Sequence, residues 1–205
     1  MLEINNLTIK TRQSILTDFS QTFESGRLYG LVATNGSGKT TFFRALMGLV
    51  PTVSGSCLFD GQPLEQRKAD LFYFEGSDWF DDNLSGLDYL NFIKREWRST
   101  ASVADLIDFW QMADYIRLPI RKYSLGMKQR LLIALYQVSD SKLLLMDEIT
   151  NGLDEAGRQQ LFTVLRGLVA GGKTIILSSH YKEDILPHCD YLLTLENQKM
   201  ELIQL

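Results

Sequence analysis

The chain has 205 residues, 45% of them hydrophobic, and a formal net charge of −4, which is sufficient for one substantial domain with a buried core. The acidic balance argues against a primarily nucleic-acid-binding protein, because phosphate contacts require a basic surface. No apolar stretch approaches the roughly 20 residues that span a bilayer, and the first residues lack the features of a signal peptide, so we expect a cytoplasmic protein.

Three short apolar runs open the chain, at residues 2–9, 15–23 and 28–32. Turn-forming residues separate them, so we predict three strands that pair as an antiparallel edge. From residue 28 onward, strand-like and helix-like segments alternate, which indicates an α/β fold with a mainly parallel sheet flanked by helices. Two further strands, at 191–195 and 199–203, are expected to close the chain around a turn.

The third run leads into a glycine-rich turn, and apolar residues then recur at helical spacing over 40–49. In such a turn, consecutive backbone N–H groups and the positive end of the helix dipole converge on phosphate oxygens. We expect Lys39 to reach the outer phosphates and Thr40 to ligate magnesium. The usual pattern starts with glycine where this chain has Ala33, which is harmless if that residue keeps a negative φ. The turn reads Thr34-Asn35-Gly36-Ser37-Gly38-Lys39-Thr40-Thr41.

The middle of the chain has a mainly helical sequence pattern. A strand is predicted at 70–74, and apolar residues at helical spacing predict two amphipathic helices between 87 and 120, where Pro119 ends the run. Trp79 and Phe80 precede these helices. Their aromatic rings suit either an interface with a partner or a local core.

Two acids follow an unbroken apolar run at 143–146, the pattern of a central parallel strand covered on both faces. Ligands of open α/β sheets bind at the carboxyl ends of such strands. We therefore expect Asp147 to hold magnesium, through water, and Glu148 to act as general base toward the attacking water. Ser124 is expected to cap an apolar helix at 131–138. His180 follows another short strand, at 174–177.

Three motifs stand in a fixed order along the chain: the glycine-rich turn, the stretch Tyr123-Ser124-Leu125-Gly126-Met127-Lys128-Gln129-Arg130, and the acidic pair. With these motifs, the chain resembles the ATP-binding subunits of ABC transporters over essentially its whole length. The version Gly-Met-Lys-Gln-Arg is similar to the branch that serves small exporters. The resemblance implies a single ATPase domain over 1–205, with a nucleotide-binding core at 1–86 and 121–205 and a helical subdomain at 87–120. ATP and Mg²⁺ are the expected cofactors.

The resemblance also implies partners. Two such subunits, identical or homologous, would close head to tail around ATP and drive a separate transmembrane permease, an exporter, on the cytoplasmic face of the membrane. The segment 75–87 would contact that permease, and no nucleic acid would be bound. Two alternatives stay open: a soluble ABC protein that acts on ribosomes or DNA, and a nucleotide-sensing subunit with little activity.

Further residue roles are implied by the resemblance alone. Ser124 and Gly126 would face the γ-phosphate held by the other subunit, and His180 would hydrogen-bond the γ-phosphate. Asp154 would couple the two sites across the interface, although it equally suits a cap for the helix that follows. Glu75 stands where the family most often has glutamine, and would contact magnesium and the water. Arg12 lies where an aromatic side chain usually stacks on adenine, and its guanidinium is a possible substitute.

Overall fold

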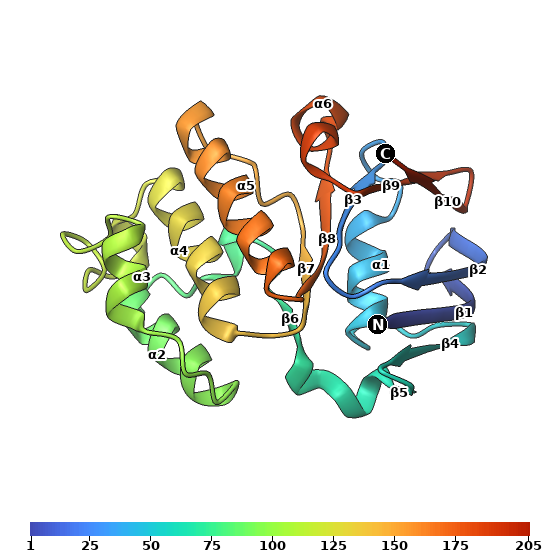
Figure 1. Ribbon diagram of the computed structural model, residues 1–205, viewed down its shortest axis with the longest axis horizontal. Coiled ribbons are helices and arrows are strands. Elements are labelled where there is room, and N and C mark those ends of the chain that lie inside the picture. Colours follow the sequence, from blue (N-terminus) through green and yellow to red (C-terminus); the bar gives the residue numbers. More distant parts are fainter.

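A six-stranded sheet forms the centre of the computed structural model, which describes residues 1–205. Its order is β10-β9-β3-β8-β7-β6. The strands from β9 to β6 are parallel, and β10 is antiparallel to β9. Figure 1 shows helices on both faces of this sheet, which confirms the predicted α/β fold. The strands are β3 (Leu28–Val32), β6 (Leu71–Tyr73), β7 (Leu143–Met146), β8 (Thr174–Ser179), β9 (Tyr191–Glu196) and β10 (Lys199–Gln204).

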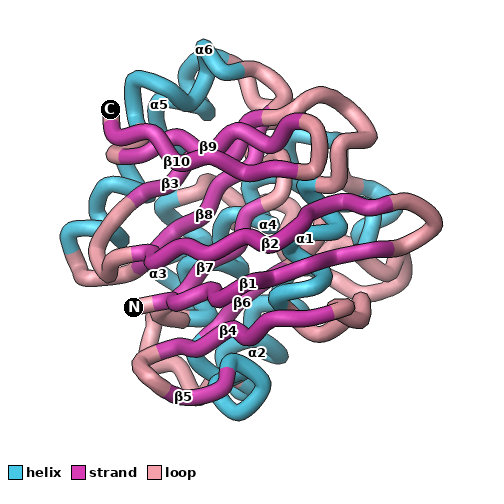
Figure 2. The backbone as a smooth tube through the Cα atoms, turned by 90° about the vertical axis from the view of Figure 1, so that its right-hand side faces the viewer, coloured by secondary structure: helices cyan, strands magenta, loops and turns pink.

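The antiparallel strands form a sheet of their own, with order β2-β1-β4-β5, and Figure 2 shows it in front of the six-stranded sheet. The prediction that residues 28–32 pair with the first two strands is wrong, because β3 lies between β8 and β9 in the parallel sheet. β3 is buried on both faces, which suits a central parallel strand rather than an antiparallel edge. This second sheet contains β1 (Leu2–Lys10), β2 (Ser14–Phe23), β4 (Ser54–Phe59) and β5 (Gln62–Pro63).

One helix lies between the two sheets, and the others cover the opposite face of the six-stranded sheet or extend beyond it (Figure 1). The helix between the sheets is α1 (Lys39–Leu46), which begins at the glycine-rich turn as predicted. No helix is both long and apolar enough to cross a bilayer. The remaining helices are α2 (Gly86–Glu96), α3 (Val103–Phe109), α4 (Leu125–Ser139), α5 (Glu155–Ala170) and α6 (Lys182–Ile185), with short 3₁₀ segments at Leu64–Asp70, Ser77–Trp79, Ile120–Lys122 and Leu186–His188.

Strand β7 is fully buried and divides the core into two clusters. Leu144 and Met146 pack with residues of α4 and α5, whereas Leu143 and Leu145 pack on the side of α1 and the antiparallel sheet. Successive side chains of a strand point to opposite faces, so an unbroken apolar run fits a strand covered on both sides. The packing confirms the predicted central strand and holds its carboxyl end, where Asp147 follows, in a fixed position.

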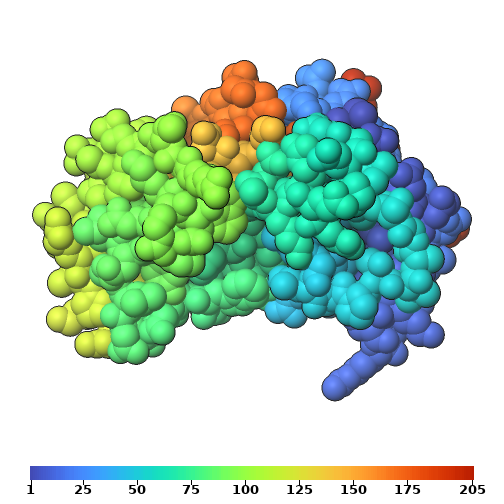
Figure 3. Space-filling model, turned by 90° about the horizontal axis from the view of Figure 1, so that it is seen from below, coloured from blue at the N-terminus to red at the C-terminus, as the bar shows by residue number.

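The segment between β6 and α4 forms a helical lobe, visible in green at the left of Figure 3, and its buried side chains share one core with α4 and α5. The two predicted amphipathic helices are confirmed as α2 and α3. Ser85 and Asp88 form a reciprocal capping box at the start of α2. Trp110 is buried and its Nε1–H donates to Gln137 on α4 at 2.5 Å. This contact ties the lobe to the rest of the chain.

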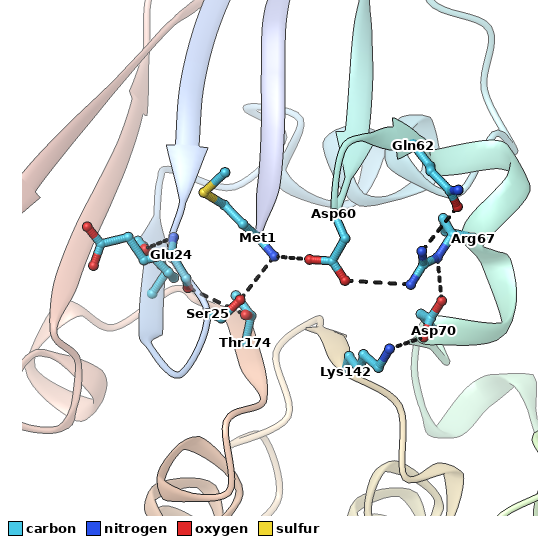
Figure 4. Close-up of polar contacts among 10 residues, drawn as sticks. Met1, Glu24, Ser25, Asp60, Gln62, Arg67, Asp70, Lys142 and Thr174 are labelled. Carbon is cyan, nitrogen blue, oxygen red and sulfur yellow. Dashed lines mark hydrogen bonds and ion pairs between the residues drawn. The ribbon is translucent and has the colours of Figure 1, made fainter.

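A chain of ion pairs links the two sheets along one edge (Figure 4). The Met1 α-amino group lies 2.6 Å from Asp60, and Asp60 lies 3.5 Å from Arg67. Arg67 and Lys142 approach Asp70 at 2.6 and 3.0 Å. Burial alone would raise the pKa of Asp70, but hydrogen bonds from these two cations outweigh it and hold the pKa below its ordinary value. The network joins the start of β1, the turn after β4 and the entry to β7.

Candidate functional site

The turn between β3 and α1 contains backbone conformations with positive φ at two of its glycines. Gly36 has a φ of +76° and Gly38 a φ of +112°, conformations that L-residues with a Cβ rarely adopt. A Cβ on Gly38 would also lie 2.2 Å from Ile15 Cγ2. Ala33 is not among the residues with positive φ, so its Cβ is tolerated. The Ser37 hydroxyl is buried in the turn without a hydrogen-bond partner, which fits an anionic ligand.

A cavity brings this turn together with two residues from distant parts of the chain. Glu148 follows β7, and His180 follows β8, so both come from the carboxyl ends of parallel strands that neighbour each other. This is the edge where ligands of α/β sheets bind. The cavity is lined by Gly36, Gly38, Lys39, Thr40, Thr41, Glu148 and His180.

Lys39 is the cation of this cavity and is only 5% exposed. Its Nζ donates to the Ala33 carbonyl at 3.0 Å and lies 3.1 Å from His180 Nδ1. Burial lowers the pKa of Lys39, and the nearby carboxylates of Glu148 and Asp147 oppose that shift. A buried ammonium whose closest partner is a carbonyl is well suited to bind an anion that enters the cavity.

Asp147 is buried at the end of β7 and accepts hydrogen bonds on both carboxylate oxygens. Thr40 Oγ1 donates to Oδ2 at 2.5 Å, and the Ser178 hydroxyl donates to Oδ1. Burial raises the pKa of Asp147, and the neighbouring Glu148 and Glu75 raise it further, although the two hydroxyls oppose the shift. Hard oxygen donors beside crowded carboxylates are the environment that Mg²⁺ prefers, so the residues fit this ion.

Glu148 adopts a left-handed backbone, with φ +50°. Its N–H donates to Ser178 Oγ at 3.0 Å, and its carboxylate accepts from Asn151 Nδ2 at 3.0 Å. The carboxylate also lies 2.5 Å from His180 Nε2. Since Lys39 can only donate to Nδ1, the contacts assign the imidazole proton to Nε2. No role is predicted for Ser178 from the sequence, although a buried serine at the carboxyl end of a parallel strand needs a hydrogen-bond partner there and is a signal for one.

Glu75 lies near this site, at the end of β6. It lines a second cavity together with Thr40, Asp147 and Glu148. The sequence predicts that Glu75 contacts magnesium and the water. In the structure, Arg44 on α1 pairs with both oxygens of its carboxylate.

Four further predicted site residues belong neither to the glycine-rich turn nor to the acidic groups beside it, and they do not line its cavity. Ser124 is exposed and caps α4, with its Oγ accepting from Met127 N at 3.3 Å. Asp154 caps α5 in the same way, accepting from Gly157 N at 2.8 Å. Both capping predictions are confirmed. Gly126 lies in the first turn of α4, and Arg12 is exposed in the turn between β1 and β2, with no hydrogen bond or ion pair from its side chain.

Trp79 and Phe80, the two aromatic residues before α2, each suit either a partner interface or a local core by their sequence, and the structure places them differently. Phe80 is 6% exposed and belongs to the core that contains α2 and α4, whereas Trp79 is 46% exposed. Phe80 is thus a core residue, and only Trp79 is available to a partner.

Comparison with known proteins decides the family. The family model described as ABC transporter matches residues 16–151. The chain belongs to the ABC transporter ATP-binding family. Over 98% of its length, the chain is 36% identical to the uncharacterized ABC transporter ATP-binding protein YybJ of Bacillus subtilis, with 95% of that protein covered. It is 32% identical to the lantibiotic transport ATP-binding protein SrtF of Streptococcus pyogenes, covering 94% of this chain and 85% of that one.

A further relative is the Nod factor export ATP-binding protein I of Cupriavidus pinatubonensis, 31% identical over 89% of this chain and 59% of that protein. Among solved structures, an ATP-binding subunit of an ABC transporter superposes with a TM-score of 0.87 at 22% identity, covering 100% of this chain and 90% of that one. A bacterial Atm1-family ABC exporter with ATP bound gives 0.84 at 23% identity, over 99% of this chain and 38% of that chain. These likenesses show the fold.

Membership of the ABC family accounts for the geometry of the site. The chain is an ATP-binding and ATP-hydrolysing subunit that powers a separate membrane-spanning subunit. Its glycine-rich turn is the P-loop of this ATPase fold, and the cavity beside it brings a buried cation, a carboxylate and an imidazole together.

Proposed function

We propose that this ABC ATPase closes head to tail with a second ATP-binding subunit, identical or homologous, and thereby drives export through its permease. One observation carries the two-subunit arrangement. Ser124 and Gly126 start helix α4 with donors suited to a phosphate, yet neither lines the cavity of the P-loop in the same chain. A second subunit would supply them to each P-loop, and Asp154 would lie at the same interface.

Within each site, the proposed roles follow from the contacts. Lys39 would exchange the Ala33 carbonyl for the outer phosphates of ATP. Thr40, and Asp147 through water, would hold Mg²⁺, which would neutralise phosphate charge. Glu148 orients the attacking water and accepts its proton, while His180 donates its Nε2–H to the γ-phosphate. Glu75 remains a candidate ligand at the edge of this site, and Arg12 a candidate for adenine stacking.

The proposed permease surface lies on the helical lobe, for which we propose the bounds 87–120, and on the segment before it. Trp79, Leu84 and Phe92 are large apolar side chains that are 46%, 44% and 48% exposed. Such a group of exposed apolar side chains suits an interface with another protein. Docking there would place the subunit on the cytoplasmic face of the membrane. Export is favoured because SrtF and the Nod factor protein are named for lantibiotic transport and Nod factor export.

The Glu148→Gln variant tests the catalytic part of the proposal. Loss of the general base is expected to lower ATP turnover by roughly 10²- to 10⁴-fold, while binding of ATP persists. Steady-state phosphate release and equilibrium nucleotide binding measure the two quantities. Unchanged turnover would refute the role of Glu148. Tight binding by the unmodified chain without any turnover would instead favour the nucleotide-sensing alternative.

Mixed dimers test the two-subunit arrangement. A Ser124→Arg substitution in one tagged subunit is expected to stop hydrolysis at the P-loop of its unmodified partner, because the arginine side chain would occupy the position of the γ-phosphate there. Combining it with Lys39→Ala in one or the other subunit shows which P-loop still turns over. Failure of the P-loop in the same polypeptide as Ser124→Arg would contradict head-to-tail closure.

A further inference from the structure

The carboxylate of Glu75 accepts hydrogen bonds from two residues of this chain. Arg44 Nε donates to Oε2 at 2.5 Å and Arg44 Nη2 donates to Oε1, so the guanidinium makes a two-point contact. The Tyr73 hydroxyl donates to Oε2 at 3.1 Å. The hydrogen bonds to Glu75 raise the pKa of Arg44 above its usual range. The Glu75 side chain is 17% exposed and that of Arg44 is 42% exposed, so the pair is solvated on the arginine side, and its defined geometry comes from the two-point contact.

Arg44 comes from the same helix that binds the phosphates. It lies four residues after Thr40 on α1, and residues four apart share one face of a helix. Thr40 and Glu75 line one cavity with Asp147 and Glu148. Three carboxylates therefore line a cavity that shares Thr40 and Glu148 with the cavity beside the P-loop, where an anionic triphosphate is proposed to bind.

We propose that Arg44 is a positioning residue that acts as the internal counter-ion of Glu75, so that a triphosphate can bind beside a third carboxylate. The inference rests on the proposed placement of ATP in the P-loop. Glu75 takes a position where a neutral glutamine is commonest in the family, and the arginine returns the local charge to that of the neutral residue. Tyr73 supports the arrangement by orienting the carboxylate toward the guanidinium.

A rival explanation is that the pair only fastens α1 to β6. In that case loss of either partner breaks the pair, so Glu75→Gln would weaken nucleotide binding as Arg44→Met does. The counter-ion role makes a different prediction, because Glu75→Gln removes the charge that Arg44 neutralises and should leave nucleotide binding unchanged or tighter. The two explanations separate in a double-mutant cycle.

The experiment measures equilibrium binding of a fluorescent ATP analogue in EDTA and low salt, where neither hydrolysis nor metal binding contributes. Arg44→Met is expected to weaken binding about tenfold, since repulsion between like charges persists at the effective dielectric constant of about 20 near a protein surface. In the Glu75→Gln background, the same Arg44→Met change is expected to cost less than about twofold in affinity. Arg44→Lys keeps the charge and is expected to stay within about threefold of the unmodified chain.

Thermal unfolding of each variant identifies any that do not fold. If Arg44→Met does not fold, Arg44→Lys replaces it, and its effect is compared in the unmodified chain and in the Glu75→Gln background. Arg44→Lys should then cost less affinity in the Glu75→Gln background than in the chain that keeps Glu75. A loss of affinity on Glu75→Gln as large as that on Arg44→Met, equal losses on changing Arg44 in the two backgrounds, or no loss in the chain that keeps Glu75, would overturn the proposal. Absence of binding by the unmodified chain in this assay would remove the P-loop assignment itself, and the counter-ion role with it.

Discussion

At the scale of single residues, the most instructive side chain is Ser178. Its hydroxyl is fully buried, donates to Asp147 and accepts from the N–H of Glu148. One hydroxyl thus orients the carboxylate proposed to hold the metal and stabilises the left-handed backbone of the proposed general base. Left-handed backbone at a residue with a Cβ costs roughly 1–2 kcal/mol, so this conformation persists only because its surroundings enforce it.

The Ser178→Ala variant should therefore lower turnover more than nucleotide affinity. Removing the hydroxyl leaves the Glu148 N–H without its partner, and an unsatisfied buried donor costs about 1–3 kcal/mol. We expect a loss of about tenfold or more in turnover, measured by phosphate release. Ser179→Ala is the matched control, because Ser179 is equally buried but bonds only to the backbone of Tyr181. Equal effects of the two substitutions would argue against a role at the site.

The two glycines of the P-loop allow a second residue-scale prediction. Gly36→Ala meets no atom within 4 Å, so it should cost only the strain of a positive φ, about 1 kcal/mol. Gly38→Ala adds a collision with Ile15 and should lower the free energy of unfolding further, by roughly 1–3 kcal/mol. Urea denaturation measures both. A smaller loss of stability for Gly38→Ala than for Gly36→Ala would contradict the close contact between Ile15 of β2 and Gly38.

At the scale of elements, α4 and α5 each begin at a capping side chain, whereas α1 begins at Gly38 without one. Ser124 and Asp154 cap α4 and α5 from their own side chains, and the same residues are proposed to lie at the interface between subunits. Capping needs only an acceptor oxygen, whereas an interface depends on shape and charge. A substitution that keeps the acceptor therefore separates the two roles.

Asp154 provides that test. Asp154→Ala removes the cap and should lower the free energy of unfolding of the isolated subunit by about 1 kcal/mol. Asp154→Asn keeps the acceptor and should leave unfolding nearly unchanged, while it alters the charge at the proposed interface. Thermal melts of the monomer measure the first effect, and ATP-dependent dimerisation measures the second. If Asp154→Asn destabilised the monomer as strongly as Asp154→Ala, the charge rather than the acceptor would be responsible.

At the scale of the whole molecule, α1 lies between the parallel and the antiparallel sheet, which share no backbone hydrogen-bond ladder. The ion-pair chain in Figure 4 joins the two sheets at their edge. The parallel sheet carries the residues of the site, and the antiparallel sheet covers the helix that follows the P-loop. Side chains of the antiparallel sheet pack against α1 in one core cluster, and this packing holds α1 in place beside the site.

The ion-pair chain should make stability depend on acid pH through Asp70. The folded-state pKa of Asp70 lies below its ordinary value, so its charge stabilises the fold above the unfolded-state pKa of about 3.9. That contribution is lost as the pH falls through the folded-state pKa. Asp70→Asn should thus destabilise the protein at pH 7, and the difference from the unmodified chain should shrink below pH 4. Urea denaturation at a series of pH values checks this, and a difference that stayed constant to pH 2 would refute it.

Several parts of the site could be predicted because their chemistry is local. The P-loop has glycines with positive φ where such backbone is needed, and Asp147 and His180 follow buried strands. The pairing of Arg44 with Glu75 could not be predicted, because 31 residues separate them and no periodicity relates a helix to the end of a strand. The same is true of Ser178 and Asp147, which are also 31 residues apart.

The sequence alone determined the family, the P-loop, the caps of α4 and α5 and the burial of β7 on both faces, since each depends on residues close together in the chain. The tertiary structure decided which sheet β3 joins, that Glu75 is paired with Arg44, and that Ser124 lies outside the cavity of its own P-loop. Those outcomes depend on contacts between distant segments. Their free energy comes from burial and charge pairing that only the assembled fold creates.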